Sequence, residues 1–468
     1  MTNTRRDFLK QSLLATLGLA ATQSPIGAAA PRGTGCQPVD ATPLRPSNQT
    51  PVHNLTTAPL EKVRVGIIGL GVRGNELIAD ILRLPFVEIN ALCDIRPDRT
   101  ERARRRAAAR KHNPSTYSGD ENAWEKLIQQ DNLDLIYIAT PWEWHCEMSV
   151  KTMLAGKHAF VEVPAAVTVE ECWRLVDTSE RTQRHCVILE NCCYGRTEML
   201  LLNMTRQNVL GTLTHAECAY IQDLRHLLFN LNAEGAWRRE YHKTINGNLY
   251  PTHGLGPVAQ YLDIGRGDQF KYLVSMSSPE AGLSRHLAKE NPNDGRHAAE
   301  KYICGDMNTT LIKTELGRTI LLQHDVVSPR PATRINALTG TGGTFFDDPP
   351  CLALDDPEKH DLETRSNQWL PEPEYEKISK RYEHPLLTHL GEEALHGGHN
   401  GMDYVMNYRL LTQIRRGQTP DMTVYDAALW SCLIELTARS VANNSAPTPI
   451  PDFTRTLWKT IPPLLVTA

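Results

Sequence analysis

Three glycines provide the first chemical signal in the chain. Gly69, Gly71 and Gly74 have the spacing G-x-G-x-x-G and follow a continuous apolar run, Val63–Leu70. In such a loop the first glycine permits a tight turn, the second lets the backbone approach a pyrophosphate, and the third allows close packing of helix against strand. The phosphates then face the unpaired N–H groups that open the next helix. The pattern predicts a dinucleotide site.

Asp94 narrows the choice of dinucleotide. It ends a second predicted strand, Phe86–Cys93, about 20 residues after Gly74. A carboxylate there accepts hydrogen bonds from both ribose hydroxyls and repels a 2′-phosphate. NAD is therefore favoured over NADP, although Arg96 is close enough to weaken the preference. The alternative for Asp94 is a cap or turn role.

Polar residues also follow three later strands of the predicted sheet. They are Thr140–His145 after the third strand, Glu162–Pro164 after the fourth, and Glu190 with Asn191 after the fifth. Ligands of doubly wound sheets bind at the carboxyl ends of the strands. We therefore expect these segments to border the nicotinamide and its ribose, although each one alone is equally well explained as a turn or cap.

Strands and helices alternate between residues 61 and 193, which predicts a Rossmann domain with a doubly wound parallel sheet. The later predicted strands of this region are Leu133–Ala139, His158–Val163 and Cys186–Glu190. The predicted helices are Asn75–Leu84, Thr100–Lys111, His145–Ala155 and Val169–Thr182.

The pattern changes over residues 194–468, where strands follow one another with few helices between them. This arrangement indicates an α+β domain with a mainly antiparallel, open-faced sheet, giving an α/β chain overall. The charged, proline-rich stretch 347–375 is expected to be a loop. The predicted strands are Thr212–Ile221, Tyr272–Ser277, Asn308–Glu315, Thr319–Val326 and Arg334–Thr339, and the late helices are Met402–Arg416 and Ala427–Ala442.

The N-terminus has the layout of an export signal. In residues 1–30 a basic segment precedes a short apolar stretch and a small-residue end at Ala28–Ala30, and the Arg5-Arg6 pair is typical of a twin-arginine signal. Residues 31–60 are expected to be a linker or an N-terminal arm. No later run is apolar for the roughly 18 residues of a membrane span. We expect a protein exported to the periplasm, which would have to bind NAD before export.

Composition and the remaining motifs exclude several function classes. The formal net charge of −4 gives no indication of a nucleic acid or anionic membrane partner. The chain has 11 cysteines, an odd number, and none of them form a C-x-x-C pair. Buried free thiols are therefore expected. His396 and His399 have a spacing compatible with a metal pair, but glycines separate them and no third ligand is evident. No metal is predicted.

Several of these motifs together resemble a known superfamily. The glycine loop, T-P-x-x-x-H at Thr140–His145 and E-x-P at Glu162–Pro164 are similar to the glucose–fructose oxidoreductase/inositol dehydrogenase/rhizopine-catabolism superfamily. Most members have a lysine where Val163 stands here, and this departure disfavours an ordinary polyol dehydrogenase. With Glu190–Tyr194 and Gly247–Pro257 added, the chain from about residue 60 onward resembles NAD-dependent glycoside hydrolase family 109, of α-N-acetylgalactosaminidase type.

The resemblance implies binding roles in both domains. Ala332 stands where members of that family have a tyrosine, which leaves the exact substrate open. The cofactor-binding residues would be Gly69, Gly71, Val72, Arg73, Gly74, Asp94, Trp142, His145, Glu162, Val163 and Asn191. The substrate-binding residues would be Tyr220, Arg238, Tyr250, Pro251, Thr252 and His253.

The same resemblance implies hydrolysis by redox-assisted elimination. A tightly bound and recycled NAD would oxidise C3 of the sugar, a base would remove the C2 proton, and the aglycone would leave from C1 before water adds and C3 is reduced again. His253 is expected to transfer the proton, because imidazole titrates near neutral pH. Tyr194 is the second catalytic candidate. We expect a shaped loop around His253. The alternatives are a histidine bonded to a loop carbonyl and a tyrosine at a domain interface.

Two other functions are compatible with the sequence. One is a periplasmic sugar oxidoreductase with tightly bound NAD(P), and the other is a non-catalytic sugar or nucleotide sensor. The expected partners are a small glycoside or glycan and the twin-arginine export machinery, with no nucleic acid and no membrane span. A homo-oligomer is left open, by analogy with the superfamily.

Overall fold

The computed structural model describes residues 42–230, 235–290, 300–355 and 368–468. The predicted export signal, residues 1–30, lies outside the described residues, as does the first part of the predicted arm. Within the described part of the chain, no helix combines the length and the apolarity needed to cross a membrane.

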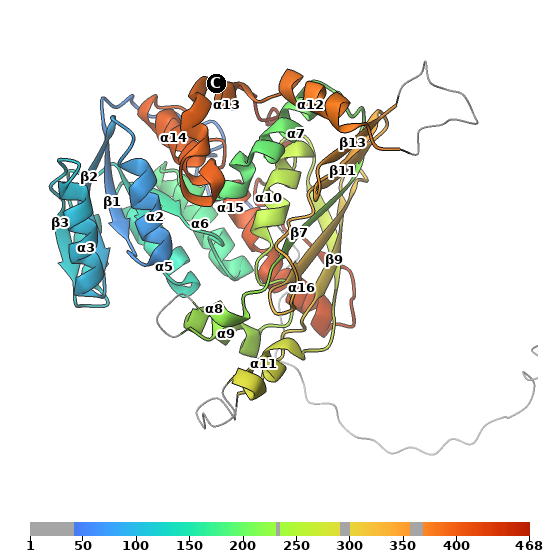
Figure 1. The fold of residues 1–468 in the computed structure, drawn as a ribbon. Coiled ribbons are helices and arrows are strands. Elements are labelled where there is room, and N and C mark those ends of the chain that lie inside the picture. Colours follow the sequence, from blue (N-terminus) through green and yellow to red (C-terminus); the bar gives the residue numbers. More distant parts are fainter. Residues whose placement is uncertain (1–41, 231–234, 291–299, 356–367) are drawn as a thin grey trace, which may run out of the picture. The chain divides into compact units, whose positions relative to one another are not determined.

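The first sheet has six parallel strands in the order β3-β2-β1-β4-β5-β6, which is the doubly wound order of a dinucleotide-binding fold (Figure 1). The central strands β1, β4 and β5 are almost wholly buried, because helices cover both faces of a parallel sheet and both faces must therefore be apolar. The strands are β1 Val63–Ile68, β2 Val87–Asp94, β3 Ser115–Ser118, β4 Leu135–Ile138, β5 His158–Val161 and β6 Cys186–Ile188.

The helices of this sheet begin close to the predicted positions. Helix α6 begins at the predicted residue, Val169, because Thr168 and Glu171 form a reciprocal capping box. The sequence did not predict β3 and α4; β3 is a short edge strand of polar, mostly exposed residues, so it lacks the apolar alternation that identifies a strand. The helices are α2 Val72–Ile81, α3 Pro97–Ala108, α4 Ala123–Ile128, α5 Trp142–Leu154 and α6 Val169–Thr182.

The second sheet has eight strands in the order β13-β12-β11-β7-β10-β9-β8-β14. All of its neighbouring strands are antiparallel except β7 and β10, and the predicted hairpin is confirmed as β9 and β10. The loop expected at 347–375 was partly wrong: it contains β13, and α12 begins within it, while its middle lies outside the described residues. The strands are β7 Leu213–Ile221, β8 Phe270–Ser277, β9 Asn308–Thr314, β10 Thr319–Asp325, β11 Ala337–Gly340, β12 Gly343–Phe346, β13 Cys351–Leu354 and β14 Thr448–Pro449.

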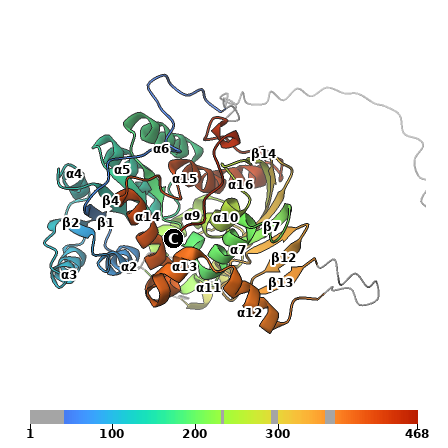
Figure 2. The same ribbon diagram turned by 90° about the horizontal axis from the view of Figure 1, so that it is seen from above.

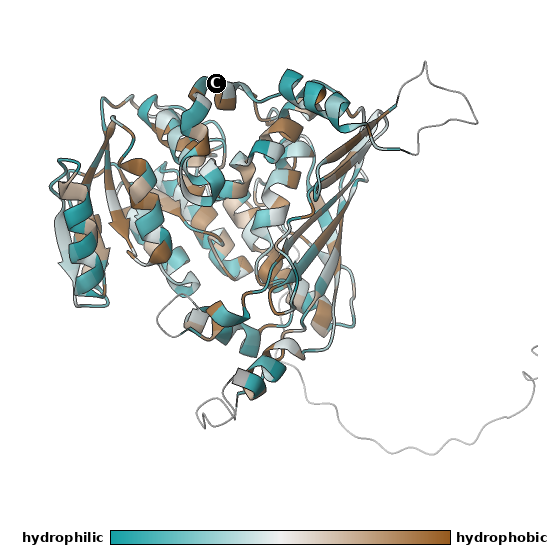
Figure 3. Ribbon diagram, in the orientation of Figure 1, coloured by the Kyte–Doolittle hydropathy of each residue, from teal (hydrophilic) through white to brown (hydrophobic). Residues whose placement is uncertain are grey.

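A layer of helices separates the two sheets (Figure 2). Helix α10 packs on β7, α16 packs on β8, and α15 contacts α6 and β6. The single late helix predicted at Ala427–Ala442 is two helices that meet at Cys432. Figure 3 shows strand β1 of the first sheet as largely hydrophobic and α3, on the outside of that sheet, as largely hydrophilic. The helices of this layer are α7 Arg196–Arg206, α10 Thr252–Tyr261, α15 Val424–Ser431 and α16 Leu433–Ala442.

Helix α14, Met402–Arg415, returns to the first sheet although it lies late in the chain. It packs against α2, β1 and the short helix η1, Asn191–Tyr194. The late chain therefore contributes to the edge of the sheet where a nucleotide is expected. The other α-helices are α8 Arg225–Leu228, α9 Gly235–Thr244, α11 Gly282–Glu290, α12 Glu372–Arg381 and α13 Pro385–Leu390, and the other 3₁₀ helices are η3 Gly391–Leu395, η4 Gly398–Gly401 and η5 Leu457–Lys459.

A buried carboxylate connects four distant segments of the chain. Glu180, on α6, is fully buried, and its oxygens accept hydrogen bonds from Arg45 at 3.0 Å, Tyr425 at 2.7 Å and Arg455 at 2.7 Å. Arg45 belongs to the stretch predicted as a linker or arm, and that part of the chain lies against α6. Removing one member of such a buried group leaves the opposite charge uncompensated.

We predict that Glu180→Gln lowers the free energy of unfolding by about 3 kcal/mol, because Arg45 loses its carboxylate partner and Arg455 keeps only Asp177, at 2.6 Å. Denaturant-induced unfolding measures the change. The matched control is Glu88→Gln, which removes the carboxylate of the exposed Lys62–Glu88 pair and should cost less than about 0.5 kcal/mol. Equal losses in the two variants would contradict the prediction.

Candidate active site

The glycine loop has the backbone geometry that its sequence predicts. Gly69 has φ +88°, and a Cβ there would lie 2.3 Å from the carbonyl oxygen of Ala139. A Cβ on Gly74 would lie 1.9 Å from the carbonyl oxygen of Gly69. At Gly71, by contrast, a Cβ would meet only the far end of the Arg99 side chain. Gly69 and Gly74 are therefore needed for packing, whereas Gly71 keeps the approach to the start of α2 open.

The start of α2 has the properties of an anion site. Its N-cap residue is Gly71, and no side chain caps the first turn. The first N–H groups of a helix have no partner within the helix, and the helix dipole favours negative charge there. These uncapped groups, beside the open space at Gly71, fit a pyrophosphate.

Asp94 lies where a ribose is expected, but it also holds the loop together. Its Oδ2 accepts a hydrogen bond from the Leu70 N–H at 2.7 Å, and its Oδ1 accepts one from the Arg96 N–H at 2.9 Å. Each carboxylate oxygen has a second lone pair, so ribose hydroxyls can still be bound. Of the two arginines near Asp94, Arg99 has its guanidinium 4.0 Å from Oδ2, while the Arg96 side chain pairs with Asp98. The expected influence of Arg96 is therefore not supported.

A cleft runs along the carboxyl ends of the parallel strands. Its lining includes nine of the eleven predicted cofactor-binding residues; Gly74 and Asn191 are the exceptions. Gly74 packs under the loop, and Asn191 lies in a neighbouring cavity. Sequence reasoning missed Arg99 and Trp237. The cleft is lined by Gly69, Gly71, Val72, Arg73, Asp94, Arg99, Ala139, Thr140, Pro141, Trp142, His145, Glu162, Val163, Trp237 and Arg238.

His145 connects two of the strand-end segments. The ring is buried, with Nδ1 at 2.7 Å from the carbonyl oxygen of Pro164 and Nε2 at 2.7 Å from that of Thr140. Burial lowers the pKa of His145. The ring therefore fixes the wall of the cleft, since both of its nitrogens lie against backbone carbonyls.

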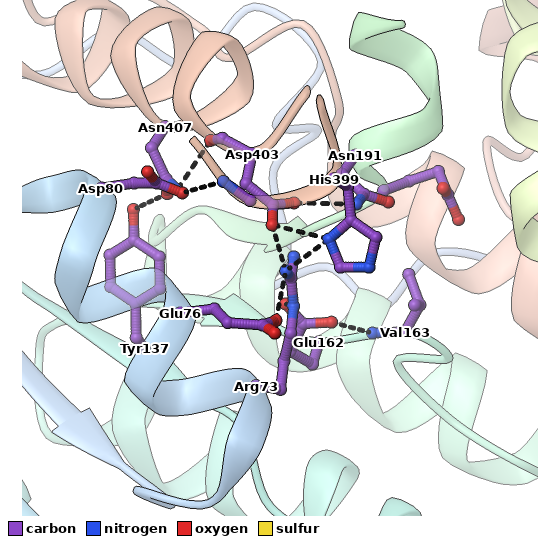
Figure 4. Close-up of polar contacts among 12 residues, drawn as sticks. Arg73, Glu76, Asp80, Tyr137, Glu162, Val163, Asn191, His399, Asp403 and Asn407 are labelled. Carbon is purple, nitrogen blue, oxygen red and sulfur yellow. Dashed lines mark hydrogen bonds and ion pairs between the residues drawn. The ribbon is translucent and has the colours of Figure 1, made fainter. Parts of the chain in front are cut away.

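Arg73 is the centre of an ion cluster between the cleft and the neighbouring cavity (Figure 4). Its Nε donates to Glu162 at 2.6 Å, and its Nη1 donates to Asp403 at 2.6 Å. Asp403 also accepts from Asn191 and from His399, each at 2.8 Å. Asp403 lies 330 residues from Arg73, and no spacing rule in the sequence identifies it.

The charges of this cluster are mutually stabilising. Burial lowers the pKa of Arg73, but Glu162 and Asp403 outweigh it and hold the pKa well above its ordinary value. Burial would raise the pKa of Asp403, but hydrogen bonds from His399 and Arg73 hold it below its ordinary value. The hydrogen bond to Asp403 raises the pKa of His399. The side chains of His399, Asp403 and Glu76 are of the types that bind metal ions and lie close together. The guanidinium of Arg73 already balances the two carboxylates.

A second cavity shares a wall with the nucleotide cleft. The two have Val72, Arg73, Glu162 and Arg238 in common. The remaining lining of the second cavity is Glu76, Asn191, Tyr220, Gln222, Leu224, Leu227, Tyr250, His253 and His399. The cavity therefore brings the predicted substrate residues Tyr220, Arg238, Tyr250 and His253 together beside the place expected for the nicotinamide.

His253 is paired with a buried carboxylate. Its Nδ1 lies 2.7 Å from Oε1 of Glu190, whose side chain is fully buried. Burial would raise the pKa of Glu190, but His253 holds it below its ordinary value. An ionised Glu190 accepts a hydrogen bond from a protonated Nδ1. In the neutral ring the lone pair is then on Nε2, where a general base needs it. Glu190 was recognised as a strand-end residue, but this pairing was not predicted.

An aromatic wall surrounds this pair. The ring of Tyr220 lies 4.5 Å from that of Tyr250 and 5.3 Å from that of His253. The guanidinium of Arg238 contacts three of the aromatic rings: its carbon lies 5.2–5.6 Å from the ring centres of Trp142, Trp237 and Tyr250. Burial raises the pKa of both tyrosines, so their phenols remain neutral.

The expectation of a loop around His253 is wrong. His253 lies in helix α10 and not in a loop. The glycines misled the interpretation because they serve packing: a Cβ on Gly254 would lie 2.6 Å from the Ala219 backbone nitrogen, and one on Gly256 would lie 2.8 Å from Cγ of Glu190. Close approach of α10 to β7 and to Glu190 overrides the low helix propensity of glycine.

The structure does not bring Tyr194 into the cavity. Its hydroxyl donates to Asp421 at 3.3 Å, and its ring lies among residues of α7, α13 and α14. The geometry therefore supports a packing role and not a catalytic one. Pro251 and Thr252 are buried at the start of α10, where they position His253 without lining the cavity. Ala332 is exposed and does not line the cavity either.

Known protein families share both halves of this architecture. Residues 63–189 match the oxidoreductase family with an NAD-binding Rossmann fold, and residues 194–460 match the glycosyl hydrolase 109 C-terminal domain. An α-N-acetylgalactosaminidase of Shewanella oneidensis is 43% identical over 463 residues, 98% of each chain. The chain belongs to glycosyl hydrolase family 109. A family 109 protein of Solibacter usitatus is 44% identical over 464 residues, 98% of this chain and 99% of its own.

Solved structures similar to this family 109 protein share its fold at low sequence identity. An oxidoreductase domain protein from Kribbella flavida has a TM-score of 0.63 at 18% identity, covering 84% of this chain and 100% of its own. Levoglucosan dehydrogenase in complex with NADH and levoglucosan has a TM-score of 0.61 at 19% identity, covering 83% and 100%. The two-part fold and the NAD-binding half that the sequence predicted are confirmed.

We predict that Gly69→Ala weakens NAD binding about 100-fold, equivalent to about 2.7 kcal/mol, because the loop must move away from Ala139. Titration of the purified protein with NAD measures the affinity. The matched control is Gly156→Ala, at φ +79° with nothing within 4 Å of an added Cβ. It carries the same backbone strain without the clash and should retain the affinity. A similar loss in both variants would contradict the role assigned to the loop.

Proposed function

We propose that the protein hydrolyses terminal α-N-acetylgalactosaminides, or a closely related glycoside, with an NAD that stays bound and is recycled in each turnover. The observation that carries the proposal is His253, which is paired with the buried Glu190 and lines a cavity that shares a wall with the nucleotide cleft. Near-full-length similarity to an α-N-acetylgalactosaminidase supports this substrate.

The residues present fit NAD. The uncapped start of α2 and the space at Gly71 accept the pyrophosphate, and Asp94 accepts the ribose hydroxyls. Bound NAD would supply hydride acceptance and return at C3 of the sugar, with the C3 hydroxyl proton passing to water and back. The ketone at C3 would make the C2 hydrogen acidic. Val163 lines the cleft as an apolar residue, so it offers no proton to the C3 oxygen.

His253 is assigned the proton at C2. With Nδ1 bonded to Glu190, the imidazole accepts a proton at Nε2, and the fixed carboxylate stabilises the imidazolium that forms. The protonated ring then donates to the aglycone oxygen that leaves C1. In the addition step the neutral ring accepts a proton from the attacking water and returns it to C2. Tyr220 and Tyr250 provide hydroxyls in the same cavity and are assigned the binding of sugar hydroxyls.

The proposal extends to export and retention of the cofactor. The Arg5-Arg6 pair in the first 30 residues supports transport by the twin-arginine machinery into the periplasm. The periplasm has no pool of NAD to replace a lost cofactor. A recycled NAD that is bound before export is consistent with both requirements.

The test of the function is turnover of a panel of p-nitrophenyl glycosides in D₂O. Release of nitrophenol from the α-N-acetylgalactosaminide, with deuterium incorporated at C2, is the expected result. Hydrolysis without label at C2 would contradict proton removal at that carbon. Absence of hydrolysis, together with reduction of NAD by free sugars, would replace the proposal with a sugar oxidoreductase. Absence of both would favour a sensor.

We predict that Glu190→Gln lowers kcat on the α-N-acetylgalactosaminide by roughly 100-fold or more, because the neutral amide no longer stabilises the charged imidazole. It should also change the pH profile of kcat, while the affinity for NAD stays the same. Steady-state kinetics from pH 5 to 9 and NAD titration measure the two effects.

The matched control is Glu198→Gln, which alters another buried carboxylate, paired with Arg334 and outside the lining of both cavities. It should keep the pH profile of the unaltered protein. If Glu190→Gln retains the original profile and loses activity only in proportion to stability, Glu190 has a structural role alone.

A further inference from the structure

The substrate cavity is lined asymmetrically. The wall that it shares with the nucleotide cleft carries Arg73, Glu162 and Arg238, and the His253–Glu190 pair lies beside the aromatic rings. Leu224 and Leu227 also line the cavity, but not the nucleotide cleft. They are half-buried, so part of each side chain remains accessible.

Leu224 and Leu227, which we call the leucine wall, are supported by the residues packed on their other side. Leu224 packs against a small second core formed by Leu228, Leu283, Leu287, Tyr302, Val326 and Val327. The Leu224 N–H donates to the carbonyl oxygen of Val326 at 2.9 Å, and Arg239 donates to the carbonyl oxygen of Leu228 at 2.9 Å. A Cβ on Gly235 would lie 1.5 Å from the Leu227 carbonyl oxygen, so α9 is packed directly against α8. The two side chains are therefore presented by a supported surface.

This wall does not suit the sugar ring itself. Every hydroxyl of a bound sugar needs a hydrogen-bond partner, and two leucine side chains provide none. An apolar group buried against them gains free energy in proportion to its area. The leucines therefore fit the part of the substrate that carries the fewest hydroxyls.

The proposed chemistry indicates which part that is. This step rests on the proposed function, in which C3 of the sugar faces the nucleotide cleft. The C2 substituent is attached to the ring atom next to C3, whereas the aglycone on C1 is one ring atom further away. Because the leucines belong to the lining that the cleft does not share, the group at C1 reaches them more readily than the acetamido group at C2.

We propose that Leu224 and Leu227 form an aglycone subsite that favours glycosides with an apolar group at C1. The enzyme then distinguishes substrates at two places. The polar part of the cavity recognises the sugar, and the leucine wall recognises the alkyl or aryl portion of the leaving group. Free sugar, which has only a hydroxyl at C1, gains nothing from this wall.

The test compares methyl and hexyl α-N-acetylgalactosaminides on the full-length protein with its NAD. The two leaving alcohols have nearly the same acidity, so their kcat/KM ratio reports apolar binding. At up to about fourfold per buried methylene, we expect a ratio of at least about tenfold in favour of hexyl, mainly through KM. Leu227→Asn keeps the side-chain shape and should bring the ratio close to one. Leu227→Ala, which adds no polar group, should lower it as well.

The ratio cancels any general loss of activity in a variant. Leu154→Asn, at an exposed leucine away from both cavities, is the matched control and should keep the ratio of the unaltered protein. A ratio near one before substitution, or a ratio that survives both Leu227 variants, would overturn this inference alone. A change in the preference between N-acetyl and N-propionyl sugars, without a change in the alkyl ratio, would overturn it too. Absence of turnover on both glycosides would overturn the proposed function itself.

Discussion

The buried guanidinium of Arg73 sets the main constraint on this structure. A charge removed from water must be balanced at close range, and breaking such a pair typically costs about 3–5 kcal/mol. Glu162 at the end of β5 and Asp403 on α14 provide that balance, each at 2.6 Å (Figure 4). The glycine loop, strand β5 and helix α14 must therefore come together before the cofactor cleft is complete.

This constraint links cofactor binding to the substrate cavity. Arg73 and Glu162 line both spaces, and Asp403 holds Asn191 and His399 on the cavity side. A displacement of the loop by an altered cofactor site would therefore also disturb the wall against which a sugar lies. The arrangement suits a reaction in which the nucleotide and the sugar must stay in register through several steps at adjacent carbons.

The cavity separates two kinds of recognition in space. Charged and aromatic groups gather near the shared wall, where hydroxyls must be bound and protons moved, and the leucines lie on lining that the nucleotide does not share. Glu190 is buried behind His253, so its charge acts through a ring of fixed orientation instead of facing the substrate directly. With polar groups where the sugar reacts and apolar groups beyond it, the site favours one orientation of the substrate.

The sequence by itself determined the features that depend on local spacing. The glycine loop, Asp94 and the strand-end residues follow from turn chemistry and from continuous apolar strands, so most of the cofactor cleft could be predicted. Only the tertiary structure decided that Asp403 balances Arg73 and that Glu190 orients His253. These pairs are 330 and 63 residues apart, and local periodicity cannot indicate contacts over such distances in the sequence. Packing decided the rest: it makes α10 a helix despite its glycines and turns Tyr194 away from the cavity.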